Sequence, residues 1–320
     1  MKAILWKHFG GAEALELGEL PTPEPKDDEL LIRVKAFTVN RTDCAMLKSS
    51  LWIMRLQTGL FKPNRPVLGT DFAGEVVATG AKVDRFAIGD RLFGFDDNGL
   101  ASHAEYLVIK QSKALAKIPE NVDYSTAAAS IEGPHYAENF LNKVNFKTGQ
   151  AVFVHGGTGG IGSALIKLIK LRGGQVTASG RGEHLSLLQD NGADRAVDYT
   201  SPDFWQMSQQ YDYVFDSVGK GTFGKFKNML IPKGVYISSE LGPGGQNLFL
   251  SLTTPLRPGK KIKFPVPLNK QQSVDMMADL LTEDKYTPLL DRTYALSETP
   301  EAFAYVLEGQ KVGNVSVKTG

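Results

Sequence analysis

The alternation of hydrophobic and polar positions divides the chain into a strand-rich first part and a later part of mixed strands and helices. Before about residue 121, short apolar stretches alternate with polar positions and are bounded by glycine or proline, which is typical of half-buried strands. These stretches cover residues 1–7, 29–36, 73–78 and 90–95. The pattern predicts a small antiparallel β-domain, either a barrel or a sandwich.

Helical and strand patterns then alternate between residues 122 and 264. Apolar positions predict helices over residues 124–129, 136–141, 161–172 and 185–191, and strands over residues 151–155, 175–178, 195–198, 213–216 and 234–238. This alternation predicts a parallel sheet covered by helices. The last segment has predicted helices over residues 272–281 and 300–308 and a strand over residues 314–318, and it could complete either domain.

Composition narrows the class of protein. The 320 residues are 42% hydrophobic and 22% charged with a net charge of +1, which is typical of a soluble globular protein and provides no basic run for nucleic acid. No stretch reaches the roughly 20 apolar residues of a membrane-spanning helix, and the N-terminus lacks a secretory signal, so we expect a cytoplasmic protein. Cys44 is the one cysteine, which excludes an intrachain disulfide and a site of several thiolates.

A glycine-rich motif follows the strand predicted at residues 151–155. It consists of Gly157, Thr158, Gly159, Gly160, Ile161 and Gly162 and contains the pattern G-x-G-x-x-G. In a strand-turn-helix context, backbone N–H groups and the helix N-terminus face the diphosphate of a dinucleotide. Gly157 would permit the tight turn, Gly159 the close approach of the diphosphate, and Gly162 the packing of helix on strand. The motif therefore predicts a dinucleotide site.

The end of the second strand in this domain indicates which dinucleotide is bound. Folds that prefer NAD place Asp or Glu about 20 residues after the motif to bind the ribose hydroxyls. This chain has Ser179, Gly180 and Arg181 there. Because no carboxylate at the strand end would repel a 2'-phosphate, and Arg181 can bind one with two hydrogen bonds, these residues favour NADPH over NADH. Arg181 as an ordinary surface residue is the alternative.

Taken together, these segments resemble the zinc-less medium-chain dehydrogenases/reductases, the quinone oxidoreductase and zeta-crystallin group, almost from end to end. The resemblance is carried by residues 39–44, 66–76, 89–94, 157–162, 216–219 and 313–315. It implies an α/β protein with a GroES-like β-barrel catalytic domain at residues 1–121, completed by residues 265–320, and a Rossmann domain with a doubly wound parallel sheet at residues 122–264. It also implies a homodimer formed through an edge strand near residues 260–264.

The positions at which zinc-dependent relatives bind their catalytic metal carry other residues in this chain. Those relatives use an early Cys, a His-Glu pair after the glycine that matches Gly69, and a later Cys or Asp. Here Asn40 approximately fills the Cys position, and Thr70 and Asp71 replace the pair. Residues 95–102 are thiol-free and too few for the structural-zinc lobe. We therefore expect no metal.

By the same resemblance, Asn40 and Asp43 belong to an N-x-x-D motif at the nicotinamide end of the cleft. Asn40 would donate a hydrogen bond to the substrate oxygen, whereas Asp43 would either take part or only hold the loop. Residues 50–61, including Trp52, would wall the substrate pocket together with Thr70. Alternatively, this segment forms an amphipathic helix against the domain, a membrane or a partner.

The resemblance also assigns cofactor contacts outside the glycine motif. His135 stands where the family commonly has a Thr at the nicotinamide, and Leu241 and Gly242 would meet the carboxamide. Tyr199 would flank the adenosine, or else be an ordinary core or surface tyrosine. The resemblance adds Asn314 to the cofactor-binding residues.

The expected chemistry follows from the missing metal. Oxidation of a plain alcohol loses the help that zinc gives to the developing alkoxide. Hydride added to a quinone or an α,β-unsaturated carbonyl instead gives a delocalised phenolate or enolate, which needs only hydrogen bonds and a water-derived proton. We expect an NADPH-dependent, zinc-independent reductase of such a small molecule. An enoyl-thioester reductase and a non-enzymatic NADPH-binding interaction protein are the alternatives.

Overall fold

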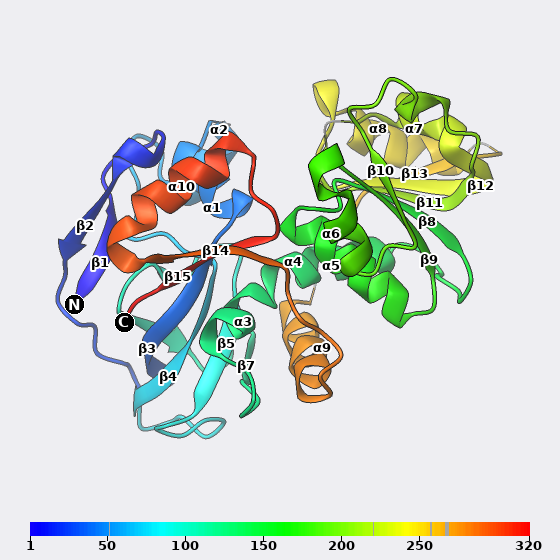
Figure 1. The fold of residues 1–320 in the computed structure, drawn as a ribbon. Coiled ribbons are helices and arrows are strands. Elements are labelled where there is room, and N and C mark those ends of the chain that lie inside the picture. The colour runs from blue at the N-terminus through cyan, green and yellow to red at the C-terminus, as the bar shows by residue number, and fades with distance from the viewer. Residues whose placement is uncertain (51, 220, 257, 266–268) are drawn as a thin grey trace. The chain divides into compact units, whose positions relative to one another are not determined.

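The computed structural model describes residues 1–320 except 51, 220, 257 and 266–268. Contacts divide the chain into two compact units (Figure 1). The first unit contains residues 1–132 together with residues 269–320, and the second contains residues 133–268. The domain boundaries at residues 121 and 264 stay a prediction.

The first unit is built on antiparallel strands. Its larger sheet has the order β14-β15-β3-β4-β5-β7, with β6 also paired to β3, and β1 and β2 form a separate pair. All of its pairings are antiparallel except β14 with β15. The strands are β1 (Lys2–Trp6), β2 (Leu15–Glu19), β3 (Glu29–Val39), β4 (Asp71–Thr79), β5 (Arg91–Phe95), β6 (Tyr106–Lys110), β7 (Leu115–Lys117), β14 (Leu290–Ala295) and β15 (Asn314–Lys318).

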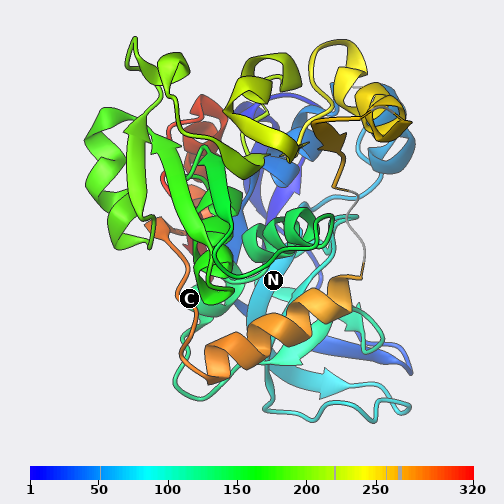
Figure 2. The same ribbon diagram turned by 90° about the vertical axis from the view of Figure 1, so that its right-hand side faces the viewer.

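Helices from both ends of the chain complete this unit. They are α1 (Arg41–Lys48), α2 (Trp52–Thr58), α3 (Tyr124–Ala129), the start of α4 (Glu132–Leu141), α9 (Lys270–Thr282) and α10 (Thr299–Glu308). Helix α10 packs against α1, and α9 packs against β5 and β7; Figure 2 shows α9, in orange, beside the cyan strands. Residues 269–320 therefore belong to the same compact unit as residues 1–132.

The second unit is a doubly wound parallel sheet, as expected. Its strand order is β10-β9-β8-β11-β12-β13, and every pairing is parallel. The strands are β8 (Ala151–His155), β9 (Gln175–Gly180), β10 (Arg195–Asp198), β11 (Tyr211–Asp216), β12 (Leu230–Ser238) and β13 (Lys261–Lys263). The chain winds from β8 to one side of the sheet and then returns to the other side at β11, which creates a switch point between these two strands.

Helices cover this sheet, and their apolar sides pack on it. They are the rest of α4, α5 (Gly160–Leu171), α6 (Leu185–Asp190), α7 (Phe223–Phe226) and α8 (Gln246–Thr253). Helix α5 contacts β8 and β9, α6 contacts β9 and β10, α7 contacts β12, and α8 contacts β13. Aromatic residues fill part of the core, among them Phe153, Tyr211, Phe226 and Tyr236. Burial of such side chains is the main stabilising contribution to folding.

Candidate active site

The glycine-rich turn connects β8 to α5 in the second unit, at the switch point of the sheet. In open parallel sheets, ligands bind outside the carboxyl ends of the strands at such a point. The first N–H groups of a helix have no carbonyl acceptor within that helix. Helix α5 begins at Gly160, so its first turn directs these donors toward any anion held there.

Three glycines of the motif differ in the space around them. A Cβ at Gly162 would lie 2.1 Å from the carbonyl oxygen of Gly156, and one at Gly157 would lie 2.8 Å from Leu188 Cδ2. At Gly159 the nearest atom would be 3.6 Å away. Gly157 and Gly162 therefore permit packing, while Gly159 leaves open space that fits a diphosphate. The left-handed φ of +79° belongs to Gly156 and not to Gly157, which we had expected to permit the tight turn.

The other motif residues lie at the same turn. Gly160 and Ile161 form the first turn of α5. Thr158 is half-buried, and its Cγ2 would lie 3.2 Å from a Cβ at Gly180. The six motif residues and the end of β9 are therefore neighbours, as a dinucleotide site requires.

Ser179 and Arg181, at the end of β9, differ in accessibility. Ser179 is fully buried, and its Oγ lies 2.8 Å from His155 Nδ1 and 3.2 Å from the N–H of Gly156. Arg181 is exposed, and its Nε donates to the Tyr199 hydroxyl at 3.2 Å. The structure thus joins Arg181 with Tyr199, while the Ser179 hydroxyl supports the glycine turn.

A carboxylate that the sequence reasoning did not consider lies at this end of the sheet. Asp198 ends β10 and pairs with Gly180 of β9. Its Oδ2 would lie 2.8 Å from a Cβ at Gly182, and its Oδ1 accepts hydrogen bonds from the N–H and hydroxyl of Thr200. The sequence could have indicated this carboxylate, because Asp198 is the last residue of the strand predicted at residues 195–198, the next predicted strand after the one that ends at the cofactor site.

The remaining predicted cofactor residues occupy different surroundings. His135 lies on α4 and is fully buried. Leu241 and Gly242 follow β12, and Gly242 has a φ of +71°, a conformation that glycine adopts readily. Asn314 begins β15 in the first unit, where its Nδ2 donates to the carbonyl of Leu289 at 3.0 Å.

The first unit, which we call the catalytic unit after the GroES-like catalytic domain that the resemblance implies, contains a buried carboxylate cluster, which we define as Asp43, Asp71 and Glu132. Asp71, at the start of β4, accepts hydrogen bonds from the N–H of Thr38 at 2.7 Å and from Asn40 Nδ2 at 2.8 Å, and it also accepts one from the Thr38 hydroxyl. Asn40 Nδ2 donates a second bond, to Thr38 Oγ1 at 2.7 Å. The two N–H bonds of the Asn40 amide therefore hold Asp71 and Thr38, which favours a positioning role for Asn40.

Threonine hydroxyls connect the other two carboxylates. The N–H of Asn40 donates to Asp43 Oδ2 at 2.9 Å. Glu132 accepts from Thr42 Oγ1 at 2.7 Å and from Thr70 Oγ1 at 2.8 Å, and Thr70 Oγ1 also lies 3.5 Å from Asp43 Oδ2. Thr70 is fully buried, and its hydroxyl donates to Glu132; its place in the substrate pocket stays a prediction.

Burial and mutual repulsion keep protons on this cluster. Burial, followed by the charges of Glu132 and Asp71, raises the pKa of Asp43 well above its usual range. Burial, followed by the charge of Glu132, raises the pKa of Asp71 to about 7. Burial raises the pKa of Glu132 to about 7, although the Thr42 and Thr70 hydroxyls and the Lys311 ammonium oppose that shift. The carboxyl groups therefore share protons near neutral pH, which is typical of acid-base sites.

A histidine lies at the inner end of this cluster. His103 Nε2 is 4.0 Å from Asp43 Oδ1, and both side chains are fully buried. The His103 ring stacks on Phe37 with a centroid separation of 4.4 Å. Burial lowers the pKa of His103 to about 3, so this ring is neutral at physiological pH.

Sequence reasoning found Asn40, Asp43 and Thr70, which the structure brings together, but it missed Glu132, Thr42 and His103 as site residues. Glu132 directly follows the mostly apolar stretch 127–131, and this position could have indicated a buried carboxylate. Trp52 begins α2, but its side chain lies outside the described residues. Within the described part of the chain, no group of three or more His, Cys, Asp or Glu side chains could hold a metal ion.

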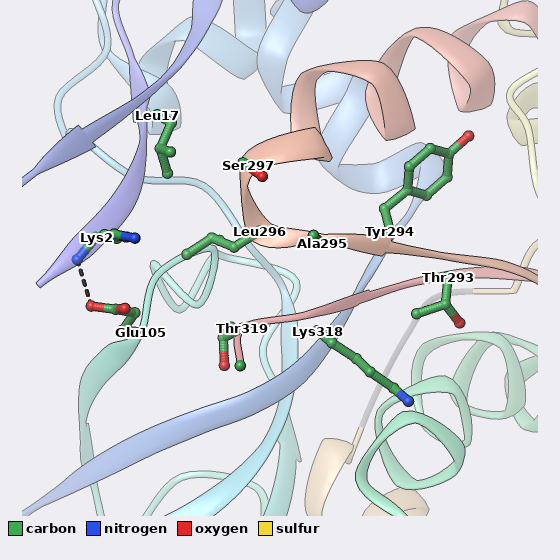
Figure 3. A pocket seen from close by; sticks show the side chains of 11 residues that line it. Lys2, Leu17, Glu105, Thr293, Tyr294, Ala295, Leu296, Ser297, Lys318 and Thr319 are labelled. Atoms are coloured by element: carbon green, nitrogen blue, oxygen red, sulfur yellow. Dashed lines mark hydrogen bonds between the residues drawn. The ribbon is translucent and has the colours of Figure 1, made fainter.

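The first unit also has a surface hollow of about 470 Å³ near its C-terminal strand. Figure 3 shows Lys2, Glu105 and Lys318 among its lining side chains. None of these charged groups is buried, and the hollow shares no residue with the carboxylate cluster.

Comparison with known proteins agrees with this architecture. Residues 26–120 match the family model of the alcohol dehydrogenase GroES-like domain, and residues 191–317 match a model described as zinc-binding dehydrogenase. No helix among the described residues has the length and apolar character of a membrane span.

Similar proteins cover the whole chain. A chloroplastic quinone-oxidoreductase homolog from Spinacia oleracea is 28% identical over 99% of this chain and 98% of its own length. An NADPH-dependent alkenal/one oxidoreductase from Arabidopsis thaliana is 30% identical over 99% of this chain and 79% of its own length. The structure of a quinone oxidoreductase from Coxiella burnetii aligns with a TM-score of 0.87 at 25% identity, covering 100% of this chain and 99% of the other.

Proposed function

Because the chain belongs to the zinc-less medium-chain dehydrogenases/reductases, in the quinone oxidoreductase-like group, we propose that it reduces quinones or α,β-unsaturated carbonyls with NADPH. The chain is an oxidoreductase. The relatives include a quinone oxidoreductase homolog and an alkenal/one oxidoreductase. Both kinds of substrate have a carbonyl conjugated with a carbon-carbon double bond.

The open space at Gly159 is the observation that carries the cofactor part of the proposal. The 3.6 Å clearance there and the N-terminus of α5 suit a diphosphate. The Arg181 guanidinium, oriented by Tyr199, would bind the 2'-phosphate. Leu241 and Gly242 would meet the carboxamide, with His135 near the nicotinamide. When bound, NADPH supplies a hydride.

Residues of the catalytic unit would stabilise the negative charge that develops on the carbonyl oxygen of the substrate. Addition of hydride to a conjugated carbon leaves negative charge that spreads onto the carbonyl oxygen, where hydrogen bonds and a proton stabilise it. Asn40 fixes Asp71 and Thr38, so the loop that carries Asp43 is held in place. The negative charge of such a product is delocalised. Hydroxyl and carboxyl groups can therefore stabilise it by donating hydrogen bonds or a proton.

Purified protein tests this proposal directly. We expect it to oxidise NADPH in the presence of some members of a panel of quinones and 2-alkenals, and to use NADH less well. Acyl-CoA thioesters in the same panel distinguish an enoyl-thioester reductase. Tight NADPH binding with no turnover on any of these compounds would overturn the proposal in favour of a binding protein.

We also propose that the protein forms a homodimer through β13. This strand lies at one edge of the sheet, and its residues Lys261–Lys263 fall within the predicted segment 260–264. Sedimentation equilibrium should give twice the mass of the chain, and a monomer at micromolar concentration would contradict the assignment.

A further inference from the structure

A continuous series of polar groups leads from the interior of the catalytic unit to a partly exposed hydroxyl. Asp43 lies 3.5 Å from Thr70 Oγ1, which lies 2.8 Å from Glu132 Oε2, and Glu132 Oε1 lies 2.7 Å from Thr42 Oγ1. Asp43 and Thr70 are fully buried, Glu132 is 7% exposed, and Thr42 is half-buried. Thr42 is therefore the most exposed member of the series.

The inner end of this series is unsatisfied, unlike an ordinary structural anchor. Asp43 Oδ1 and His103 Nε2 are buried, and neither has a hydrogen-bond partner among the described residues. An unpaired buried polar group costs about 1–3 kcal/mol. Asp71, by contrast, accepts hydrogen bonds from Thr38 and Asn40. Asp71 and Asp43 each accept a hydrogen bond from a backbone N–H in residues 38–40, whereas Glu132 accepts from the Thr42 and Thr70 hydroxyls and from no backbone N–H among the described residues, which leaves Glu132 for another role.

The charges around Glu132 set its protonation. The carboxylates of Asp43, Asp71 and Asp97 disfavour a negative charge on this cluster, whereas the Lys311 ammonium favours one on Glu132. His103 is neutral because burial lowers its pKa. With burial as the largest cause, the pKa of Glu132 rises to about 7. A proton donor works best when its pKa lies near the operating pH.

We propose that Glu132 is the proton donor of the reduction and that the Thr42 hydroxyl passes the proton to the substrate oxygen. The inference rests on the proposed function, which supplies the hydride and its electron pair. The enolate or phenolate oxygen forms a bond to the Thr42 hydroxyl proton, and Thr42 Oγ1 takes the proton of Glu132. Glu132 is left as a carboxylate beside Thr70 and Lys311 until water protonates it again.

The substitution Glu132→Gln tests the donor, because it keeps the shape and removes the acid. At saturating NADPH, we expect the wild-type kcat to fall as pH rises above about 7, because deprotonated Glu132 cannot donate. E132Q should lose roughly 100-fold in kcat together with that alkaline limb, while its Kd for NADPH stays unchanged. E120Q, which alters an exposed glutamate of the same unit, should keep the wild-type profile.

A second pair of variants keeps the test decisive if E132Q does not fold. T42V should lose kcat, and T42S, which retains the hydroxyl, should restore it. Infrared difference spectra of the protein without coenzyme give a separate readout, since E132Q should lack part of the protonated-carboxyl band that wild type loses near neutral pH. A folded E132Q with wild-type kcat and an unchanged alkaline limb would overturn the relay. If wild type reduces no quinone or enone, the proposed function fails, and the infrared titration still decides whether Glu132 holds the proton.

Discussion

The Nε of Arg181 donates a hydrogen bond to the Tyr199 hydroxyl at 3.2 Å, and this bond joins the residues that follow two neighbouring parallel strands, β9 and β10. It fixes the plane of an exposed guanidinium. No hydrogen bond from the terminal nitrogens of Arg181 is found within the described part of the chain, so they can bind two oxygens of one phosphate.

This geometry predicts that Arg181→Ala weakens NADPH binding selectively. Loss of a charge-assisted hydrogen bond to a phosphate costs about 1.5–3 kcal/mol, so the Kd for NADPH should rise about ten-fold or more. The Kd for NADH should change less than about two-fold, because NADH lacks the 2'-phosphate. Calorimetric titration with both coenzymes measures the difference.

Arg195→Ala is the matched control for that measurement. Arg195 is an exposed arginine at the start of β10, where it bonds to Gln209. Its removal should leave both Kd values unchanged. Equal losses of NADPH and NADH affinity in R181A would show that Arg181 supports the fold of the site and does not read the phosphate.

The glycine motif predicts opposite effects for two alanine substitutions. Gly162→Ala places a Cβ 2.1 Å from a backbone oxygen, which should cost about 2 kcal/mol of stability. Gly159→Ala meets no atom closer than 3.6 Å and has an ordinary φ of −76°, so its stability should change by less than about 1 kcal/mol. Because the added methyl occupies the space for the diphosphate, G159A should lose NADPH affinity. Thermal melting and coenzyme titration, run on both variants, separate the two effects. Unchanged NADPH binding by G159A would place the diphosphate elsewhere.

Local sequence patterns account for most of the second unit. The strand at residues 195–198 and the glycine turn were predicted because an apolar stretch and a glycine motif each consist of neighbouring residues in the sequence. The start of α4 was predicted at residue 136, four residues after its observed start at Glu132. In the structure Pro134 lies in the first helical turn, where its missing N–H costs nothing.

The first unit has two features that local sequence patterns do not predict, strand β14 and the carboxylate cluster. Strand β14 is mostly exposed or half-exposed along its length, so no apolar alternation marks it, and β15 supplies its pairing. The carboxylate cluster joins positions 43, 71 and 132, which no sequence spacing relates. Their meeting depends on the register of β3 with β4 and on the path of the chain into α4. Sequence reasoning could therefore name Asp43 but not its partner Glu132.

An ion-pair cluster around Asp96 predicts how strongly helix α9 is held to the strands of the first unit. Asp96 accepts hydrogen bonds from Lys113 and from Lys270 of α9, each at 2.7 Å. Burial acts to raise the pKa of Asp96, but these hydrogen bonds hold that pKa well below 3.8. Asp96→Asn should cost about 2 kcal/mol near neutral pH, since both ammonium groups are partly exposed and recover some hydration.

The pH dependence of that cost identifies its origin. A depressed pKa means that the stabilisation is complete above the unfolded value and is lost as pH falls through the folded value. The difference in unfolding free energy between wild type and D96N should therefore shrink in acid, below the ordinary value of 3.8. D84N, at an exposed aspartate, provides the control. Urea melts that show the same difference at every pH would exclude the ion pairs as its source.

Asp43 predicts the opposite pH dependence, because its pKa is raised by burial and by Glu132 and Asp71. The folded state then binds more protons than the unfolded state, so its stability falls as pH rises from the ordinary value toward the raised one. Asp43→Asn mimics the protonated acid, and its amide can still accept from the Asn40 N–H while its NH2 group points at His103. D43N and wild type should therefore be equally stable below the ordinary value of 3.8, and D43N should become the more stable as pH rises above it. Urea unfolding over a series of pH values measures the divergence, with D84N at an exposed aspartate of the same unit as the control. A D43N protein that is less stable than wild type at alkaline pH would mean that Asp43 is held as a carboxylate, and the proton series from Asp43 to Thr42 would lose its inner member.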